Sequence, residues 1–355
     1  MKKFLIINPF GIGDCLFTTP VIKAIKEKYP DCFIAYWCNQ RVGDLLKNNQ
    51  KINLVISLSR GDLKKIFAVS FFEGMKAFFD LINKIRRERF DVCLDFSLDY
   101  RYGIITKLLG IKTRIGFNYK NRGFFLTHKS KINGYDSKHM VDYYLELLNY
   151  LDIKPFNPSL ELSVSEKSLI RMQRVFQQAG LSENDFIVGI APGAGASWGK
   201  SALLKHWPAI KYAQLAEKLV SELGAKVVIL GDLSDVGTAE MISGMMKNKP
   251  LDLTGKTSLG DFAAAVKNLD ILVTNDGGPL HVAVALGVKT VSLFGPVDEL
   301  IYGPYPVSPK NIVIKKDLVC RPCYKNFRMP VCQHDRECIK TIEVEEVLSA
   351  IRRMK

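Results

Sequence analysis

The sequence predicts an α/β protein built from two doubly wound domains. Short apolar runs of strand length alternate with amphipathic segments of helix length, which is typical of parallel sheets covered by helices on both faces. The alternation stops at Asp152–Ser163, a stretch with two prolines and no helical period, and then starts again. A length of 355 residues also favours two domains. We therefore expect domains at residues 1–160 and 161–355, with a ligand cleft at the carboxyl ends of their strands.

In the first domain, each run of apolar residues predicts a buried strand. The expected strands are residues 3–8, 33–38, 53–57, 91–96 and 114–117. Helices are expected between and after them, at residues 15–29, 42–48, 74–89, 102–109 and 137–151. The first helix should end near Pro30, because proline cannot continue a helix.

The second domain repeats the pattern. Strands are expected at residues 186–191, 226–230, 251–253, 270–273 and 288–294. Helices are expected at residues 166–179, 208–223, 234–247, 259–268, 280–286 and 344–353. The longest apolar runs have the length of strands, so no membrane span is expected. Polar residues and glycines interrupt the apolar start too soon for a signal peptide, so a cytoplasmic protein is expected.

The positive charge is concentrated in the first half of the chain. Residues 1–160 carry 26 Lys/Arg and 15 Asp/Glu, a net +11, whereas the remainder carries +3 of the total of +14. This excess predicts an anionic partner: a membrane surface, an acidic substrate or nucleic acid. A solubilising surface is the alternative. No nucleic-acid-binding module pattern is present, so no specific nucleic-acid partner is expected. The basic candidates for ligand contact include Arg60, Arg114, Lys120 and Arg122.

A glycine-rich turn at Thr274–Pro296 is the strongest candidate for a ligand site. Gly277, Gly278 and Pro279 lie between a predicted strand and a predicted helix. Free N–H groups and the helix dipole at such a turn attract anions. Asp276 and His281 add polar groups at the same place. The alternative is a tight strand-to-helix turn without a ligand.

A second candidate is Asn8–Pro20, which contains Asp14 at another strand-to-helix turn. Aspartate is a favoured helix N-cap, so Asp14 has a structural alternative. If it faces a cleft, its carboxylate can take a proton from a hydroxyl nucleophile.

A third candidate is Ala191–Pro208, which nearly matches the phosphate loop around Lys200. That motif needs a sustained helix after the lysine, and Pro208 comes too soon for one. The glycine-rich loop, including Gly193, can still approach a diphosphate, with Lys200 or Lys205 as the counter-charge. A kinase that uses Lys200 is the alternative.

Four cysteines near the end of the chain form a fourth candidate. Their spacing is C-x2-C-x8-C-x5-C, at Cys320, Cys323, Cys332 and Cys338. Such a cluster suits a structural zinc better than a cytosolic disulfide. His334 is a substitute ligand. The alternative is four reduced thiols in a surface loop.

Taken together, these motifs resemble those of glycosyltransferase family 9, the bacterial lipopolysaccharide heptosyltransferases. The resemblance covers nearly the whole chain. Its marks, in order, are Gly11–Asp14, Thr18–Pro20, Arg114–Gly116, His139–Leu145, Pro192–Ala194, Lys205–Pro208, Asn275–His281, Ala285–Val288 and Leu293–Pro296.

The resemblance implies a GT-B architecture, with an acceptor-binding domain at 1–160 and a donor-binding domain at 161–355 that includes the Cys-rich segment 320–338. It implies metal-independent, inverting transfer of a heptose from a nucleotide sugar, usually ADP-heptose. Asp14 is then the catalytic base. The residues implied in donor binding are Gly193, Lys205, Asp276, Gly277, Gly278 and His281.

The implied acceptor is a lipid-linked acidic glycan of the lipopolysaccharide core, which places the protein peripherally at the inner face of the bacterial inner membrane. The family requires no cofactor for catalysis. The alternatives are a non-catalytic protein of this fold that binds a nucleotide or an anionic sugar, and a family member that uses a different sugar donor. Gly277 departs from members with a hydroxyl side chain there, and the cysteine cluster is absent from the best-known members.

Overall fold

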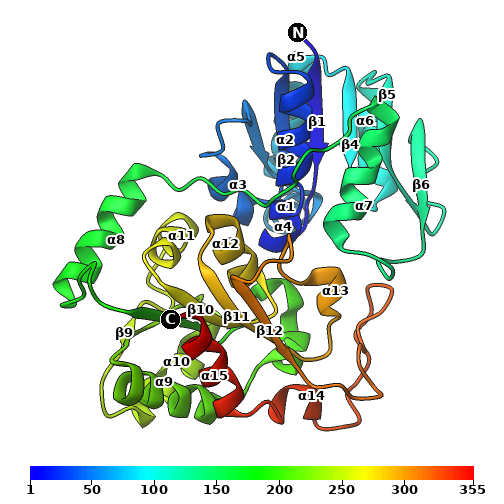
Figure 1. Ribbon diagram of the computed structural model, residues 1–355. Helices are drawn as coiled ribbons and strands as arrows, with labels where there is room; N and C mark the ends of the chain where they lie inside the picture. The colour runs from blue at the N-terminus through cyan, green and yellow to red at the C-terminus, as the bar shows by residue number, and fades with distance from the viewer. The chain divides into compact units, whose positions relative to one another are not determined.

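The computed structural model describes the backbone of residues 1–355, and every side chain except those of residues 196–198 and 200. The chain forms two compact units, Met1–Ser163 and Val164–Lys355. Each unit is an open, parallel, six-stranded sheet with helices packed on both faces (Figure 1). The predicted α/β class, with two doubly wound units, is confirmed.

Unit 1 has the strand order β3-β2-β1-β4-β5-β6. Its strands are β1 (Lys3–Ile7), β2 (Phe33–Cys38), β3 (Leu54–Ser57), β4 (Val92–Asp95), β5 (Thr113–Tyr119) and β6 (His128–Ile132). Its helices are α1 (Ile12–Leu16), α2 (Thr19–Lys28), α3 (Gln40–Leu46), α4 (Arg60–Val69), α5 (Phe71–Glu88), α6 (Tyr100–Leu108), α7 (Met140–Glu146) and the 3-10 helix η1 (Leu147–Leu151). The chain runs outward from β1 in one direction and from β4 in the other. The topological switch point therefore lies between β1 and β4.

Apolar side chains hold helices against both faces of this sheet. On one face, α4, α5 and α6 bury residues such as Leu63, Leu81 and Tyr102 against Leu5 and Trp37. On the other face, α2 packs beside α7. Tyr144 of α7 lies against Phe96, with ring centroids 4.5 Å apart.

One local prediction for unit 1 was wrong, and two elements were not predicted. The helix expected at residues 15–29 is broken between α1 and α2, where the hydroxyls of Thr18 and Thr19 bond to the carbonyls of Cys15 and Leu16 at 2.6 and 2.7 Å. Such bonds compete with helix continuation. Helix α4 was missed, although Ser59 and Asp62 form a capping box at its start. Strand β6 was missed because its sequence, HKSKI, is polar, as suits a strand at the edge of a sheet.

Unit 2 repeats the topology, with the strand order β12-β11-β10-β7-β8-β9. Its strands are β7 (Ile187–Ala191), β8 (Lys226–Ile229), β9 (Leu251–Asp252), β10 (Ile271–Asn275), β11 (Lys289–Phe294) and β12 (Asn311–Lys315). Its helices are α8 (Glu166–Gln178), η2 (Ala196–Lys205), α9 (Ala209–Leu223), η3 (Leu233–Asp235), α10 (Val236–Met245), α11 (Leu259–Lys267), α12 (Gly278–Leu286), α13 (Glu299–Tyr302), α14 (Glu337–Lys340) and α15 (Val344–Met354). Its switch point lies between β7 and β10.

The core of unit 2 separates its helices into two groups. Helices α9, α10 and α15 cover the face that carries Ile190, Val273 and Leu293. Helix α11 packs on α8 and on α12, and an ion pair of 2.6 Å joins Arg171 to Asp261 between α8 and α11. Strand β12 was not predicted, and it lies at the edge of the sheet.

The stretch Asp152–Ser163 contains no helix or strand, as expected of a connector. It lies against unit 1, where Thr19 Oγ1 accepts the N–H of Glu161 at 3.0 Å and Lys28 Nζ donates to the carbonyl of Asp152 at 3.2 Å. Within the described part of the chain, no helix is both long enough and apolar enough to cross a bilayer.

Candidate active site

The candidate residues gather at the switch point of each sheet. In unit 1, Asp14 follows β1, and β1 pairs with β4 in the register Ile7↔Asp95. In unit 2, the Gly193 loop follows β7, and Asp276 follows β10, which pairs with β7. Ligands of doubly wound sheets bind at this place, beyond the carboxyl ends of the strands.

Two predicted donor-binding residues of unit 2 form a buried ion pair. Lys205 Nζ lies 2.5 Å from Asp276 Oδ2, and the two side chains are 2% and 5% exposed. Lys205 is the last residue of η2, and Asp276 directly follows β10. The structure thus brings together two residues that are far apart in the sequence. Their mutual neutralisation makes their burial tolerable, since an isolated buried charge is costly.

Asn275 fixes the segments around this pair. Its side chain is fully buried; Nδ2 donates to the carbonyl of Pro192 at 2.5 Å, and Oδ1 accepts the N–H of Trp207 at 3.2 Å. One amide therefore connects β10 to the loop after β7 and to the residues after Lys205. Sequence reasoning placed Asn275 in a motif but gave it no role.

Close backbone approach explains two of the predicted glycines. A Cβ on Gly277 would lie 2.8 Å from the carbonyl oxygen of Ala194, and a Cβ on Gly193 would lie 2.3 Å from both carboxylate oxygens of Asp235. Glycine removes both clashes. Gly277 is the N-cap of α12, Gly278 begins the helix, and His281 lies in its first turns, 4% exposed. Free N–H groups at the start of a helix favour anions, and those of α12 face the turn that connects it to β10.

Asp235 was missed in the sequence. It lies beneath Gly193, and burial raises its pKa to about 6, although the N–H of Asp232 donates to it at 3.1 Å and opposes that change. Asp232 and Asp235 form a capping box at η3, but the burial that raises the pKa of Asp235 is not visible in the sequence.

Asp14 lies in the first turn of α1, in unit 1. The N-cap is Gly11, so the cap alternative was wrong in its position. Asp14 Oδ2 nevertheless accepts the N–H of Gly11 at 3.1 Å, and Asn8 Nδ2 donates to the Asp14 carbonyl at 2.9 Å. The half-buried carboxylate is thereby oriented at the end of β1.

Two further groups of unit 1 have raised pKa values, and one of them, Tyr144, lies close to Asp14. Burial raises the pKa of the Tyr144 hydroxyl well above its usual value, and the nearby Tyr135 and Asp14 raise it further. At the end of β4, burial raises the pKa of Asp95 to about 6, against the effect of a hydrogen bond of 2.8 Å from the N–H of Ser97. Sequence reasoning missed Asp95, because its perturbation comes from burial.

The structure does not gather the four predicted acceptor-binding residues. Arg60 pairs with Asp99 at 3.3 Å. Lys120 and Arg122 are exposed in the turn after β5, whereas Arg114 lies near the start of that strand. Arg114 Nε donates to the carbonyl of Phe125 at 2.8 Å, and Nη1 donates to that of Ile111. These carbonyl contacts give Arg114 a structural role in the β5–β6 connection.

The structure lacks the sustained helix that a phosphate loop at Lys200 would require. Residues 196–205 form the 3-10 helix η2, with a non-helical residue at Gly199, and no sustained α-helix follows the motif. The side chain of Lys200 itself lies outside the described residues.

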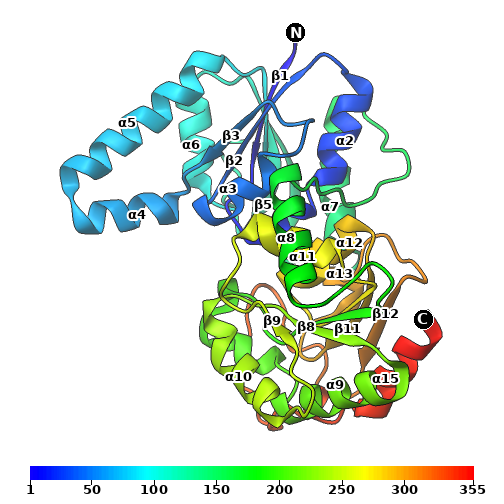
Figure 2. The same cartoon turned by 90° about the vertical axis from the view of Figure 1, so that its left-hand side faces the viewer.

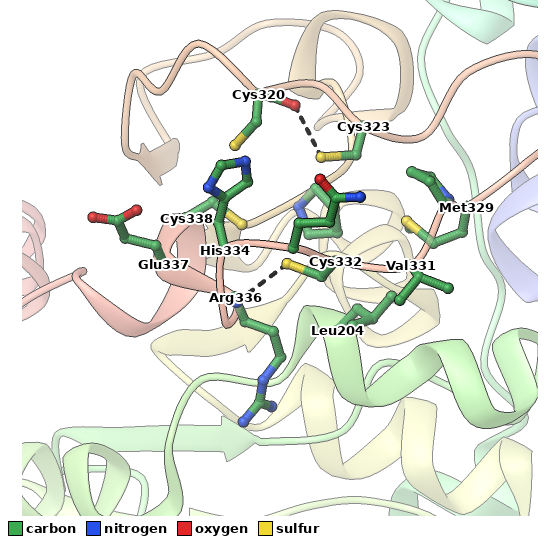
Figure 3. Close-up of a pocket in the computed structure, with 13 residues that line it drawn as sticks. Leu204, Cys320, Cys323, Met329, Val331, Cys332, His334, Arg336, Glu337 and Cys338 are labelled. Atoms are coloured by element: carbon green, nitrogen blue, oxygen red, sulfur yellow. Dashed lines mark hydrogen bonds between the residues drawn. The ribbon is translucent and has the colours of Figure 1, made fainter.

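The four cysteines line one cavity of about 330 Å³ in unit 2 (Figure 3). Among the described side chains, no three Cys, His, Asp or Glu groups already converge closely enough to hold a metal ion.

Comparison with known proteins agrees with this geometry. The family model "Glycosyltransferase family 9 (heptosyltransferase)" matches residues 78–330. The chain is 26% identical over 301 residues to lipopolysaccharide heptosyltransferase 3 of Escherichia coli, covering 82% of this chain and 83% of the relative.

Two solved structures share the fold. A family 9 glycosyltransferase of Veillonella parvula superposes with a TM-score of 0.83 at 22% identity, over 99% of this chain and 97% of that one. The E. coli ADP-heptose lps heptosyltransferase II superposes with a TM-score of 0.77 at 23% identity, over 100% and 98% of the two chains. The expected GT-B fold is confirmed. The chain is a glycosyltransferase and belongs to glycosyltransferase family 9, the heptosyltransferase family.

Proposed function

We propose that this protein transfers a heptose, with inversion, from ADP-heptose to an acidic acceptor of the lipopolysaccharide core. The two E. coli relatives named above are lipopolysaccharide heptosyltransferases, and the name of the solved one includes ADP-heptose. The observation that carries the proposal is the buried Lys205–Asp276 pair beside the N-terminus of α12.

On the donor side, the proposal assigns the diphosphate to the start of α12. The helix dipole and the first N–H groups favour the anion, and Gly277 and Gly278 let it approach the backbone. Asp276 holds the ammonium of Lys205 in place. The electrostatic interaction of that charge with an anion is stronger in a buried site than in water. Together these groups stabilise the negative charge that develops on the leaving diphosphate.

On the acceptor side, the proposal assigns proton removal to Asp14. The acceptor O–H proton moves to the carboxylate as the oxygen forms a bond to the anomeric carbon. The bond between that carbon and the diphosphate oxygen breaks, and its electron pair leaves with ADP. Because Oδ2 of Asp14 already accepts the N–H of Gly11, the carboxylate needs little reorientation for this role.

Basic side chains at the carboxyl edge of the unit 1 sheet suit the acidic acceptor. Arg60 begins α4, directly after β3, and Lys120 and Arg122 follow β5. All three are exposed. Arg114 is excluded from this proposed set, because its guanidinium is bound to backbone carbonyls.

We further propose peripheral attachment to the cytoplasmic face of the inner membrane through the α4–α5 hairpin. Figure 2 shows these two helices extending from the sheet of unit 1. Three large apolar side chains at the turn are exposed, Val69 by 90%, Phe71 by 65% and Phe72 by 83%, and Phe79, further along α5, is exposed by 53%. Residues 60–89 carry eight Lys/Arg and four Asp/Glu, a net +4. An apolar tip within a basic segment suits an anionic lipid surface.

The test is heptose transfer from ADP-heptose to a heptose-deficient lipopolysaccharide, followed by mass spectrometry. Asp14→Asn should slow transfer by about 10²–10⁴-fold, the usual contribution of a general base. It should keep ADP binding, because asparagine can still accept the N–H of Gly11. Asp31→Asn, at an exposed carboxylate of the same unit, is the matched control.

Each outcome decides between the alternatives. Full turnover by Asp14→Asn would leave Asp14 a structural residue and refute the mechanism. Stabilisation of the wild type by ADP without transfer to any acidic glycan would favour a non-catalytic binding protein. Stabilisation by a different nucleoside diphosphate would favour another sugar donor.

A further inference from the structure

The cavity that the four cysteines share lies outside the proposed transfer site. Cys320, Cys323, Cys332 and Cys338 all line it, and all four are free thiols (Figure 3). The other cysteines of the chain are buried in unit 1. The sequence thus concentrates half of its eight thiols around one small space.

The segment that carries three of these cysteines has no apolar core of its own. Between β12 and α14, residues 316–336 contain no helix or strand, only an isolated bridge between Lys325 and Arg328. Apart from the side chain of Arg321, all of these residues are at least partly exposed. Loops longer than about 12–15 residues without regular structure are uncommon in compact domains, and a small unit without a core of its own usually needs a staple.

The two ends of the cysteine set are already fixed at the end of β11. The N–H of Cys323 donates to the carbonyl of Pro296 at 2.9 Å. Arg321, whose side chain is 6% exposed, pairs with Glu299 at 3.0 Å and donates to the carbonyl of Val297 at 3.1 Å. Cys338 is buried on α14, and its Sγ would lie 3.6 Å from a Cβ on Gly295.

Cys332, between the two fixed ends, accepts a hydrogen bond at its sulfur. Cys332 Sγ accepts the backbone N–H of Arg336 at 3.3 Å, and Arg336 Nη1 donates to the carbonyl of Leu203 at 2.8 Å. The residues between Cys323 and Cys338 are not buried. This part of the loop can therefore move toward the two fixed ends without breaking contacts of the core. Closure on an ion is expected, because binding of a structural metal and ordering of its loop are coupled.

We infer that Cys320, Cys323, Cys332 and Cys338 bind one tetrahedral divalent ion of the thiolate-preferring class, Zn²⁺ or Fe²⁺. Four sulfurs, the tight C-x2-C hook and closure of a loop without a core are the features of a structural tetrathiolate site. The ion fastens the loop to the end of β11 and, through Arg336, supports the Leu203–Lys205 segment. The inference does not depend on the transfer reaction.

The experiment uses the full-length protein, purified without chelators under reducing conditions. Elemental analysis should find about one zinc or iron per chain, and it distinguishes the two metals. Cys320→Ser and Cys332→Ser should lose the metal, whereas Cys32→Ser, at a buried thiol of unit 1, should keep it. His334→Ala should also keep it, because four thiolates complete the set.

A second measurement needs no variant, so it tests the inference even if the cysteine variants do not fold. Wild-type protein stripped of its metal should take up Co²⁺ with the charge-transfer and visible bands of tetrahedral thiolate coordination, and should regain its lost thermal stability. Less than about a tenth of a metal ion per chain together with no Co²⁺–thiolate bands would overturn the inference. Disulfides among the four cysteines in protein kept under reducing conditions would overturn it as well.

Discussion

Lys205 and Asp276 form an ion pair of 2.5 Å that is almost completely removed from solvent. Replacing Lys205 by Met leaves the Asp276 carboxylate buried without its counter-charge, which should lower the free energy of unfolding by about 3–5 kcal/mol. The double variant Lys205→Met/Asp276→Leu should recover most of this loss, because both charges are then gone. Urea denaturation measures both effects.

Loss of the Lys205–Asp276 pair should also weaken binding of ADP. Wild type at about 100 times the Kd of ADP should gain roughly 2.7 kcal/mol of stability, and the double variant should gain little. Lys267→Met, at an exposed lysine of α11, is the control and should behave as wild type. A single Lys205→Met variant as stable as wild type would contradict the buried pair.

Gly277 approaches the loop after β7 so closely that a methyl group cannot fit. In Gly277→Ala the new Cβ would lie 2.8 Å from the Ala194 carbonyl oxygen, so the start of α12 must shift. We expect a loss of about 1–3 kcal/mol, as for other overpacked sites, with weaker ADP binding. The control is Gly237→Ala in α10, where a Cβ meets nothing within 4 Å; it should stabilise by up to about 1 kcal/mol. Equal effects of the two variants would contradict the close approach.

Asp95 should make unit 1 less stable as the pH rises. Its folded-state pKa is raised to about 6, whereas an unfolded aspartate titrates near 3.9. Between about pH 4 and 6 the folded state holds a proton that the unfolded state has lost, so the free energy of unfolding falls across this window. The full effect above pH 6 is on the order of 3 kcal/mol.

Asp95→Asn should remove this dependence, since an amide can still accept the N–H of Ser97. The variant should match wild type at pH 4 and exceed it in stability at pH 8, as read from hydrogen exchange of the β1 and β4 amides. Asp235, with a pKa also raised to about 6, provides the parallel case in unit 2. An equal stability difference between Asp95→Asn and wild type at both pH values would rule out the titration.

The apolar tip of the α4–α5 hairpin should decide membrane binding. Phe71→Ser/Phe72→Ser should weaken binding to anionic phospholipid vesicles by at least about tenfold, because burial of each phenylalanine is worth roughly 1.5–3 kcal/mol. Leu108→Ser, at a side chain that is 78% exposed at the end of α6, should bind as wild type. Co-sedimentation with the vesicles at low and high salt measures the binding of both variants. Unchanged binding by the double variant would exclude the hairpin as the attachment site.

The sequence alone determined the features that depend on neighbouring residues. Apolar runs, glycines and prolines mark strands and turns locally, so the repeated α/β pattern, the turn at Gly277–Gly278 and the family motifs could be recognised from the order of residues. Even here, the break after α1 and the edge strands β6 and β12 were missed. Hydrogen bonds from the Thr18 and Thr19 hydroxyls to nearby carbonyls break the helix after α1. Strands at the edge of a sheet need no apolar run, so β6 and β12 left no signal.

Tertiary structure decided which of these residues act together. Lys205 meets Asp276, and Asn275 reaches Pro192, because β7 and β10 are neighbours in the sheet although far apart in the chain. The raised pKa values of Asp95 and Asp235 follow from burial, which no local pattern reports. The spacing of the cysteines came from the sequence, but only the packing of the loop against the end of β11 placed them around one cavity.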